Sequence, residues 1–176
     1  MLGLISYAGN YITFPAGLLT LTLIASSWLA IRADQQAGDR SKLALAVVVS
    51  INTLNTCGLL VAGFIALRQP TEILFEYPAE DYFFLFGMAA LSLLGDARLV
   101  FTRQPLSRQQ GVLRHLWRMG LALFIAVGSA FGGPGAAVFP QSVRESGALV
   151  MPEVLVLLAS LYFFIRVKRE RWFVET

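Results

Sequence analysis

The most chemically loaded stretch of the chain runs from residue 94 to residue 119. Asp96 and Arg98 close one apolar run, and the only histidine, His115, opens the next together with Arg118. A charge in hydrocarbon is costly unless it is paired or reaches the interface. We therefore expect an antiparallel hairpin in which Asp96 contacts Arg118 or His115 and Arg98 extends to lipid phosphates. This cluster would be a structural clamp or, because imidazole titrates near neutrality, a proton-relay or ligand site.

A second polar group lies within an apolar run at residues 50–57. Asn52, Asn55 and Thr56 are spaced i, i+3 and i+4, so on a helix they share one face. Asparagines at this depth need partners in neighbouring helices or in water. The spacing is compatible with interhelical hydrogen bonds and also with the polar lining of a substrate or quinone cavity.

The last apolar run carries a carboxylate, Glu153, close to its start. This side chain could reach the membrane interface, pair with Arg144 or Arg68, or remain accessible to protons. In the preceding run, Gly128 and Gly132 have the four-residue spacing that allows two helices to approach closely.

The chain offers few residues for catalysis or for binding a cofactor. A haem held by two histidines needs a partner for His115, and none exists. His115 and Met119 are four residues apart on one helix face and cannot bind opposite sides of one iron. Cys57 is the single cysteine, so a cysteine metal cluster is excluded. Because phosphate-binding, nucleophile-elbow and HExxH motifs are also absent, we predict no cofactor, no metal and no enzymatic activity.

Composition places these residues in a membrane protein. Of 176 residues, 56% are hydrophobic and 14% charged, where soluble domains have about 25% charged residues. The apolar residues form long uninterrupted runs, which is typical of transmembrane helices. We predict an all-α integral membrane protein, a single domain spanning residues 1–176. Its five helices are expected at residues 11–31, 43–67, 82–101, 113–131 and 148–165.

The distribution of charge predicts an orientation. Of the 14 lysines and arginines, 12 fall in residues 32–42, residues 98–118 and the C-terminal tail, which five spans place on one side of the membrane. Cytoplasmic loops carry the excess of Lys and Arg. The N-terminus is therefore expected outside and the C-terminus in the cytoplasm. The basic loops favour lipid headgroups over nucleic acid as partners.

Several motifs in the second half resemble a known family. The chain contains Gly95-Asp96-x-Arg98, a basic loop, His115-Leu-Trp-Arg118-Met119 and, before its basic end, Leu161-Tyr162. Over about residues 90–170 it resembles an uncharacterised family of bacterial multi-helix inner-membrane proteins. The resemblance implies a helical bundle in the bacterial inner (cytoplasmic) membrane. The histidines expected around the first two helices of that family are absent here.

Together these observations predict a non-catalytic accessory or assembly subunit of a larger bacterial membrane complex. Its partners would be the lipid bilayer and other membrane-protein subunits. The first alternative is a small transporter or ligand-binding membrane protein, and the second is a redox subunit. The candidate polar or titrating residues are Asp96, Arg98, His115, Arg118, Asn52, Asn55 and Glu153.

Overall fold

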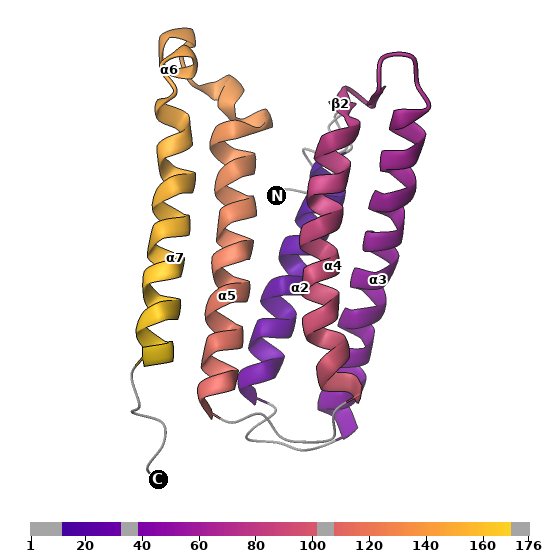
Figure 1. The fold of residues 1–176 in the computed structure, drawn as a ribbon, viewed down its shortest axis with the longest axis vertical. Coiled ribbons are helices and arrows are strands. Elements are labelled where there is room, and N and C mark those ends of the chain that lie inside the picture. The colour runs from indigo at the N-terminus through magenta and orange to yellow at the C-terminus, as the bar shows by residue number, and fades with distance from the viewer. Residues whose placement is uncertain (1–11, 33–38, 102–107, 170–176) are drawn as a thin grey trace. The chain divides into compact units, whose positions relative to one another are not determined.

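A computed structural model describes residues 12–32, 39–101 and 108–169 (Figure 1). The described chain is predominantly helical, as expected. It divides into two compact units, residues 1–22 with 38–103 and residues 23–37 with 104–176. Helix α2 (Thr13–Arg32) contributes its first half to the first unit and its second half to the second. Each unit is described by itself below.

The first unit is built around two long helices, α3 (Asp39–Leu67) and α4 (Ala79–Phe101), which pack side by side. A short antiparallel hairpin joins them, with strands β1 (Ile73–Leu74) and β2 (Tyr77–Pro78). Phe83 of α4 packs against α3, because its ring lies edge-on to Phe64 with a centroid separation of 5.6 Å. Gly63 leaves the space that this ring fills.

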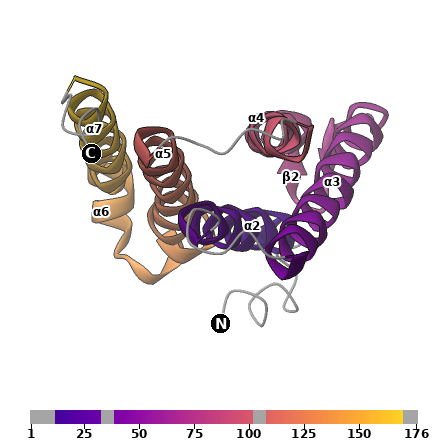
Figure 2. The ribbon, with the colours of Figure 1, turned by 90° about the horizontal axis from the view of Figure 1, so that it is seen from below.

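The second unit pairs α5 (Arg108–Val127) with α7 (Met151–Arg169), which run side by side in both ribbon views (Figures 1 and 2). A π-helical turn, η1 (Gly128–Gly132), continues α5. Three short helices then lead to α7: η2 (Pro134–Val138), α6 (Gln141–Glu145) and η3 (Ala148–Val150). Gly147 adopts φ 73°, a left-handed conformation that glycine allows without a steric penalty, immediately before η3.

The helix boundaries agree with the predicted runs to within five residues. Helix α3 begins at Asp39, four residues before the predicted start, and two further differences lie in α5 and α7. The helix predicted at 113–131 begins at Arg108, because the polar residues ahead of it are good helix formers and Gln109 donates a hydrogen bond to the Val167 carbonyl of α7 at 3.1 Å. The helix predicted at 148–165 continues to Arg169, since basic side chains are favourable in the last turn of a helix.

Three helical segments are long and apolar enough to cross a membrane, among the residues that the structure describes. They are Leu43–Leu67, Gln109–Gly132 and Ala148–Arg169. The described apolar part of α2, Thr13–Leu29, is shorter. Helix α4 carries Glu80 and Asp81 in its first turn and Asp96 further along. Membrane insertion of at least part of the fold is thus supported by helix length and composition.

The connector between α3 and α4 is acidic, aromatic and tightly turned. Glu72, Phe75 and Glu76 all adopt positive φ, and the Tyr82 hydroxyl donates to the Leu74 carbonyl at 2.7 Å. At the junction with α4, partial burial and the neighbouring Glu80 raise the pKa of Asp81. This unit therefore ends in a strained, negatively charged hairpin.

Candidate functional site

In the second unit, two serines of α2 contact the polar residues of α5. The Ser27 hydroxyl lies 2.6 Å from Nδ1 of His115 and 3.4 Å from the His115 backbone carbonyl oxygen. Ser27 is wholly buried, whereas His115 is half-buried. A buried side chain from a second helix therefore fixes one nitrogen of the only imidazole in the chain.

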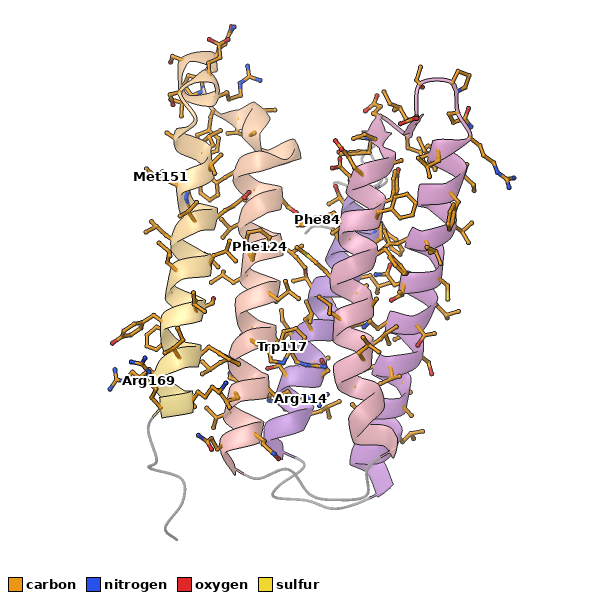
Figure 3. The ribbon with its side chains drawn as sticks, in the orientation of Figure 1. Phe84, Arg114, Trp117, Phe124, Met151 and Arg169 are labelled. Carbon is orange, nitrogen blue, oxygen red and sulfur yellow. The ribbon has the colours of Figure 1, made fainter. Side chains whose placement is uncertain are left out.

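Arg118 lies one turn beyond His115 and is wholly buried. Its guanidinium donates a hydrogen bond to the Ser26 hydroxyl and lies 5.3 Å from the centre of the Trp117 ring. Arg114 is also buried, and Arg114 and Trp117 extend from the side of α5 turned away from α7 (Figure 3). Two buried guanidiniums on one face of a helix are costly unless hydrogen bonds and counter-charges surround them.

The predicted contact of Asp96 with Arg118 or His115 remains a prediction, because these residues belong to different units. Asp96 is buried on α4, with 1% of its surface exposed. Arg98 falls within α4, but its side chain lies outside the described residues. Of the four residues in the predicted cluster, only His115 and Arg118 can be placed together, on adjacent turns of α5.

In the first unit, the predicted polar face of α3 is buried. Asn52, Asn55 and Thr56 all lie inside the unit. The Asn55 amide nitrogen donates to the Pro15 carbonyl of α2 at 3.1 Å, and the Thr56 hydroxyl donates to the Asn52 carbonyl of its own helix at 2.7 Å. Asn55 thus makes the interhelical hydrogen bond expected of an asparagine in a helix pair.

Asn52 differs from Asn55. Its side chain is completely buried, and neither Oδ1 nor Nδ2 has a hydrogen-bond partner among the described residues. The large majority of buried side-chain polar atoms in native proteins are hydrogen-bonded to protein or ordered water. An amide with both atoms unpaired is therefore an exception among the buried polar groups of the described chain.

The packing of α3 on α4 shows what faces Asn52. Gly63 of α3 lies opposite Phe83 of α4, since a Cβ on Gly63 would lie 3.0 Å from the Phe83 ring. This contact fixes the register of the two helices. Asn52 precedes Gly63 by about three helical turns and so lies on the same face. In an antiparallel pair it is level with the segment between Ser92 and Asp96, which are both buried on α4.

Glu153 of α7 packs against the glycines of the π-helical turn. A Cβ built on Gly128 or on Gly132 would lie 3.1 or 3.0 Å from Glu153 Oε1. Both glycines thus face the carboxylate of Glu153, and the close helix approach expected from their spacing stays a prediction. Within the described residues, no hydrogen bond or ion pair joins Glu153 to Arg144, so one of the pairings considered for it is not formed. Glu153 is in the first turn of α7, whereas His115 is near the start of α5. Because α5 and α7 are antiparallel, the two residues lie near opposite ends of this helix pair.

Sequence reasoning missed three residues of these polar groups: Ser26, Ser27 and Ser92. Each is a serine in an apolar run that reads as a small packing residue. A signal was present, because Ser92 precedes Asp96 by one helical turn and Ser26 with Ser27 forms a polar pair within a predicted span. The partners of the two α2 serines lie about 90 residues away, and no local pattern predicts such a contact.

The contacts within these groups are hydrogen bonds. No group of three His, Cys, Asp or Glu side chains that could hold a metal ion occurs in the described chain. No protein-family model, curated protein or solved structure matches this sequence. The arrangement of the residues is therefore the basis for assigning a function.

Proposed function

We propose that this protein is a small transporter or ligand-binding membrane protein that binds a polar molecule inside the membrane. The observation that carries the proposal is the complete burial of the Asn52 amide without a partner in the described chain. Asn52 is nine residues beyond Leu43, the start of a candidate span, which is about 14 Å at 1.5 Å per residue. That is near the middle of a hydrocarbon core of about 30 Å.

The proposed topology has five membrane spans, with α2 and α4 crossing alongside the three longer candidates. The N-terminus is outside and the C-terminus is cytoplasmic, because this arrangement puts 12 of the 14 basic residues on the cytoplasmic side. We place the protein in a bacterial inner membrane, which is what the resemblance expected over residues 90–170 would imply.

The amide of Asn52 defines the chemistry of the ligand. Oδ1 accepts hydrogen bonds and Nδ2 donates them, so a matching molecule must offer both a donor and an acceptor. A bare cation would satisfy only Oδ1. A small neutral molecule with a hydroxyl or amide group satisfies both atoms.

Swelling of proteoliposomes in isotonic glycerol or urea tests transport, because both solutes are neutral and carry donors and acceptors. Vesicles with the wild-type protein should swell faster than protein-free vesicles, and Asn52→Leu should remove most of the difference. Thr53→Leu is the matched control, because Thr53 is exposed and its hydroxyl bonds only to its own helix. Transport of these solutes is ruled out if wild-type and protein-free vesicles swell equally.

A second function, accessory subunit of a larger membrane complex, is favoured by a different observation. Helix α7 has no buried residue, although it is apolar along most of its length. Large exposed side chains such as Leu158 and Tyr162 would then contact lipid or another subunit. Purification in mild detergent distinguishes the two functions, because an accessory subunit elutes with stoichiometric partners. Elution as a single, stable polypeptide would contradict the accessory function.

A further inference from the structure

Glu153 lies in a notch formed by two glycines of the π-helical turn η1. A Cβ on Gly128 would be 3.1 Å from Glu153 Oε1, and a Cβ on Gly132 would be 3.0 Å from the same atom. Hydrogen bonds in a π-helix span five residues, so residues four apart lie about one turn apart and on the same side of η1. We call this pair of positions the glycine notch. The carboxyl fits there because neither glycine has a side chain.

The glycine notch offers the Glu153 carboxyl no strong hydrogen-bond donor. A glycine presents only a C–H group in the direction of a Cβ, and C–H groups are weak donors. A glutamate in the first turn of a helix can accept a hydrogen bond from a backbone N–H, and Glu153 is in the first turn of α7. Within the described chain, however, no hydrogen bond or ion pair reaches its carboxyl. Glu153 is therefore not a helix cap.

Few charged groups surround the glycine notch. Residues 119–140, which include most of the second half of α5 and all of η1 and η2, contain no ionisable side chain, and neither does η3. On α6, Arg144 does not pair with Glu153, and Glu145 accepts a hydrogen bond from Gln141 at 2.6 Å. The other titratable side chains on the described parts of α5 and α7 lie toward the opposite end of the helix pair: Arg114, His115, Arg118, Tyr162, Arg166, Lys168 and Arg169.

An ionised carboxyl in the glycine notch lacks the partners that usually stabilise it. Glu153 is the sixth residue of the candidate span Ala148–Arg169, and a charge in hydrocarbon is costly unless it is paired. Protonation removes that cost. We propose that Glu153 is a proton-binding site, whose carboxyl is neutral in the glycine notch and ionised when it turns out toward water. One O–H bond forms or breaks at the carboxyl, and the proton is exchanged with water. This site is in the second unit and does not depend on the one proposed at Asn52.

Dicyclohexylcarbodiimide tests the proposal, because this apolar reagent reacts with a protonated carboxyl. The proton moves to one carbodiimide nitrogen, and the carboxyl oxygen bonds to the central carbon. The full-length protein is treated in phosphatidylcholine vesicles over a range of pH, and mass spectrometry of its peptides gives the modified fraction of each carboxyl. At neutral pH the reagent should modify Glu153 several-fold more than Glu145, which is exposed. The modified fraction of Glu153 should fall as the pH rises.

A variant that fills the glycine notch separates protonation from position in the membrane. Gly128→Ala combined with Gly132→Ala should displace the carboxyl toward water and lower its modified fraction several-fold at neutral pH. Gly111→Ala, at an open site on α5, is the matched control and should leave that fraction unchanged. Three results would each overturn the proposal: equal modification of Glu153 and Glu145, a modified fraction that does not change with pH, or equal modification in the double variant and the control. Circular dichroism and size exclusion check folding, and the wild-type pH dependence decides the proposal if the double variant does not fold.

Discussion

The helix pairs α3–α4 and α5–α7 are both antiparallel, but different residues hold them together. Where α3 meets α4, the buried positions include large polar side chains, Asn52 and Asp96. Where α5 meets α7, small residues bring the backbones close, as Gly120 does against Ser160. Polar groups buried inside a helix pair are costly unless they are bound to something, whereas close backbone contact is favourable in itself. The α3–α4 pair is therefore the better candidate for function and the α5–α7 pair for rigid packing.

The largest effect should come from filling the closest contact of the α5–α7 pair. A Cβ on Gly120 would lie 2.6 Å from the Ser160 hydroxyl oxygen. Gly120→Leu should destabilise the protein by about 1–3 kcal/mol, because overpacking forces the helices apart. Thermal unfolding in detergent measures the loss. Gly111→Ala is the control, since its site is open and alanine should instead stabilise α5 by about 0.5–1 kcal/mol. Equal effects of both variants would show that α7 is not closely packed on α5.

The two asparagines of α3 should respond differently to the same change. Asn55→Leu removes the hydrogen bond to the Pro15 carbonyl and should cost about 0.5–1.5 kcal/mol. Asn52→Leu breaks no hydrogen bond to a described residue. The free energy of unfolding of the protein should therefore change less than with Asn55→Leu. Unfolding by denaturant in mixed micelles compares the two. A larger loss for Asn52→Leu would mean that this amide has a protein partner and that the proposed site is wrong.

A smaller effect is expected where α3 meets Phe83. Gly63→Ala would place its Cβ 3.0–3.2 Å from three ring atoms, and the ring can shift by a few tenths of an ångström. We expect a loss below about 1 kcal/mol in the free energy of unfolding. Gly58→Ala, in the same helix but with open space at its Cβ, should be neutral or stabilising. If Gly63→Ala is as favourable as Gly58→Ala, the proposed register of Asn52 with Ser92 and Asp96 loses its support.

The smallest effect concerns the acidic hairpin above the α3–α4 pair. Partial burial and Glu80 raise the pKa of Asp81, so the folded state favours the protonated carboxyl. Protonated Asp81 therefore contributes to the free energy of unfolding at low pH. This contribution is lost as the pH rises through the raised pKa of Asp81. Asp81→Asn should therefore be slightly more stable than wild type at neutral pH. The difference should vanish once the pH falls below about 4. A variant that is less stable at neutral pH would show that the carboxylate is stabilising.

The sequence predicted the helices better than it predicted the contacts. Long apolar runs such as 43–67 imply a helix because the membrane requires internal backbone hydrogen bonds, and α3 ends at Leu67 as expected. The start of α5 was less predictable, because Gln109 and Gln110 fit a loop or a helix until Val167 of α7 supplies a partner.

The candidate site was only partly predictable for the same reason. Spacing alone put Asn52 and Asn55 on one face, but no local rule shows that Asn55 bonds to Pro15 while Asn52 does not. Likewise, Ser27 was not expected to contact His115, because the two residues are 88 positions apart. Interhelical contacts depend on how the helices rotate and slide against each other, which a single sequence does not encode locally.

The most direct test of the proposed site is a density map of the full-length protein in a bilayer at a resolution that resolves ordered water. A molecule that is not part of the polypeptide should lie about 3 Å from both Oδ1 and Nδ2 of Asn52, between α3 and α4. Direct hydrogen bonds from both amide atoms to neighbouring side chains, with no third molecule, would contradict the proposed function.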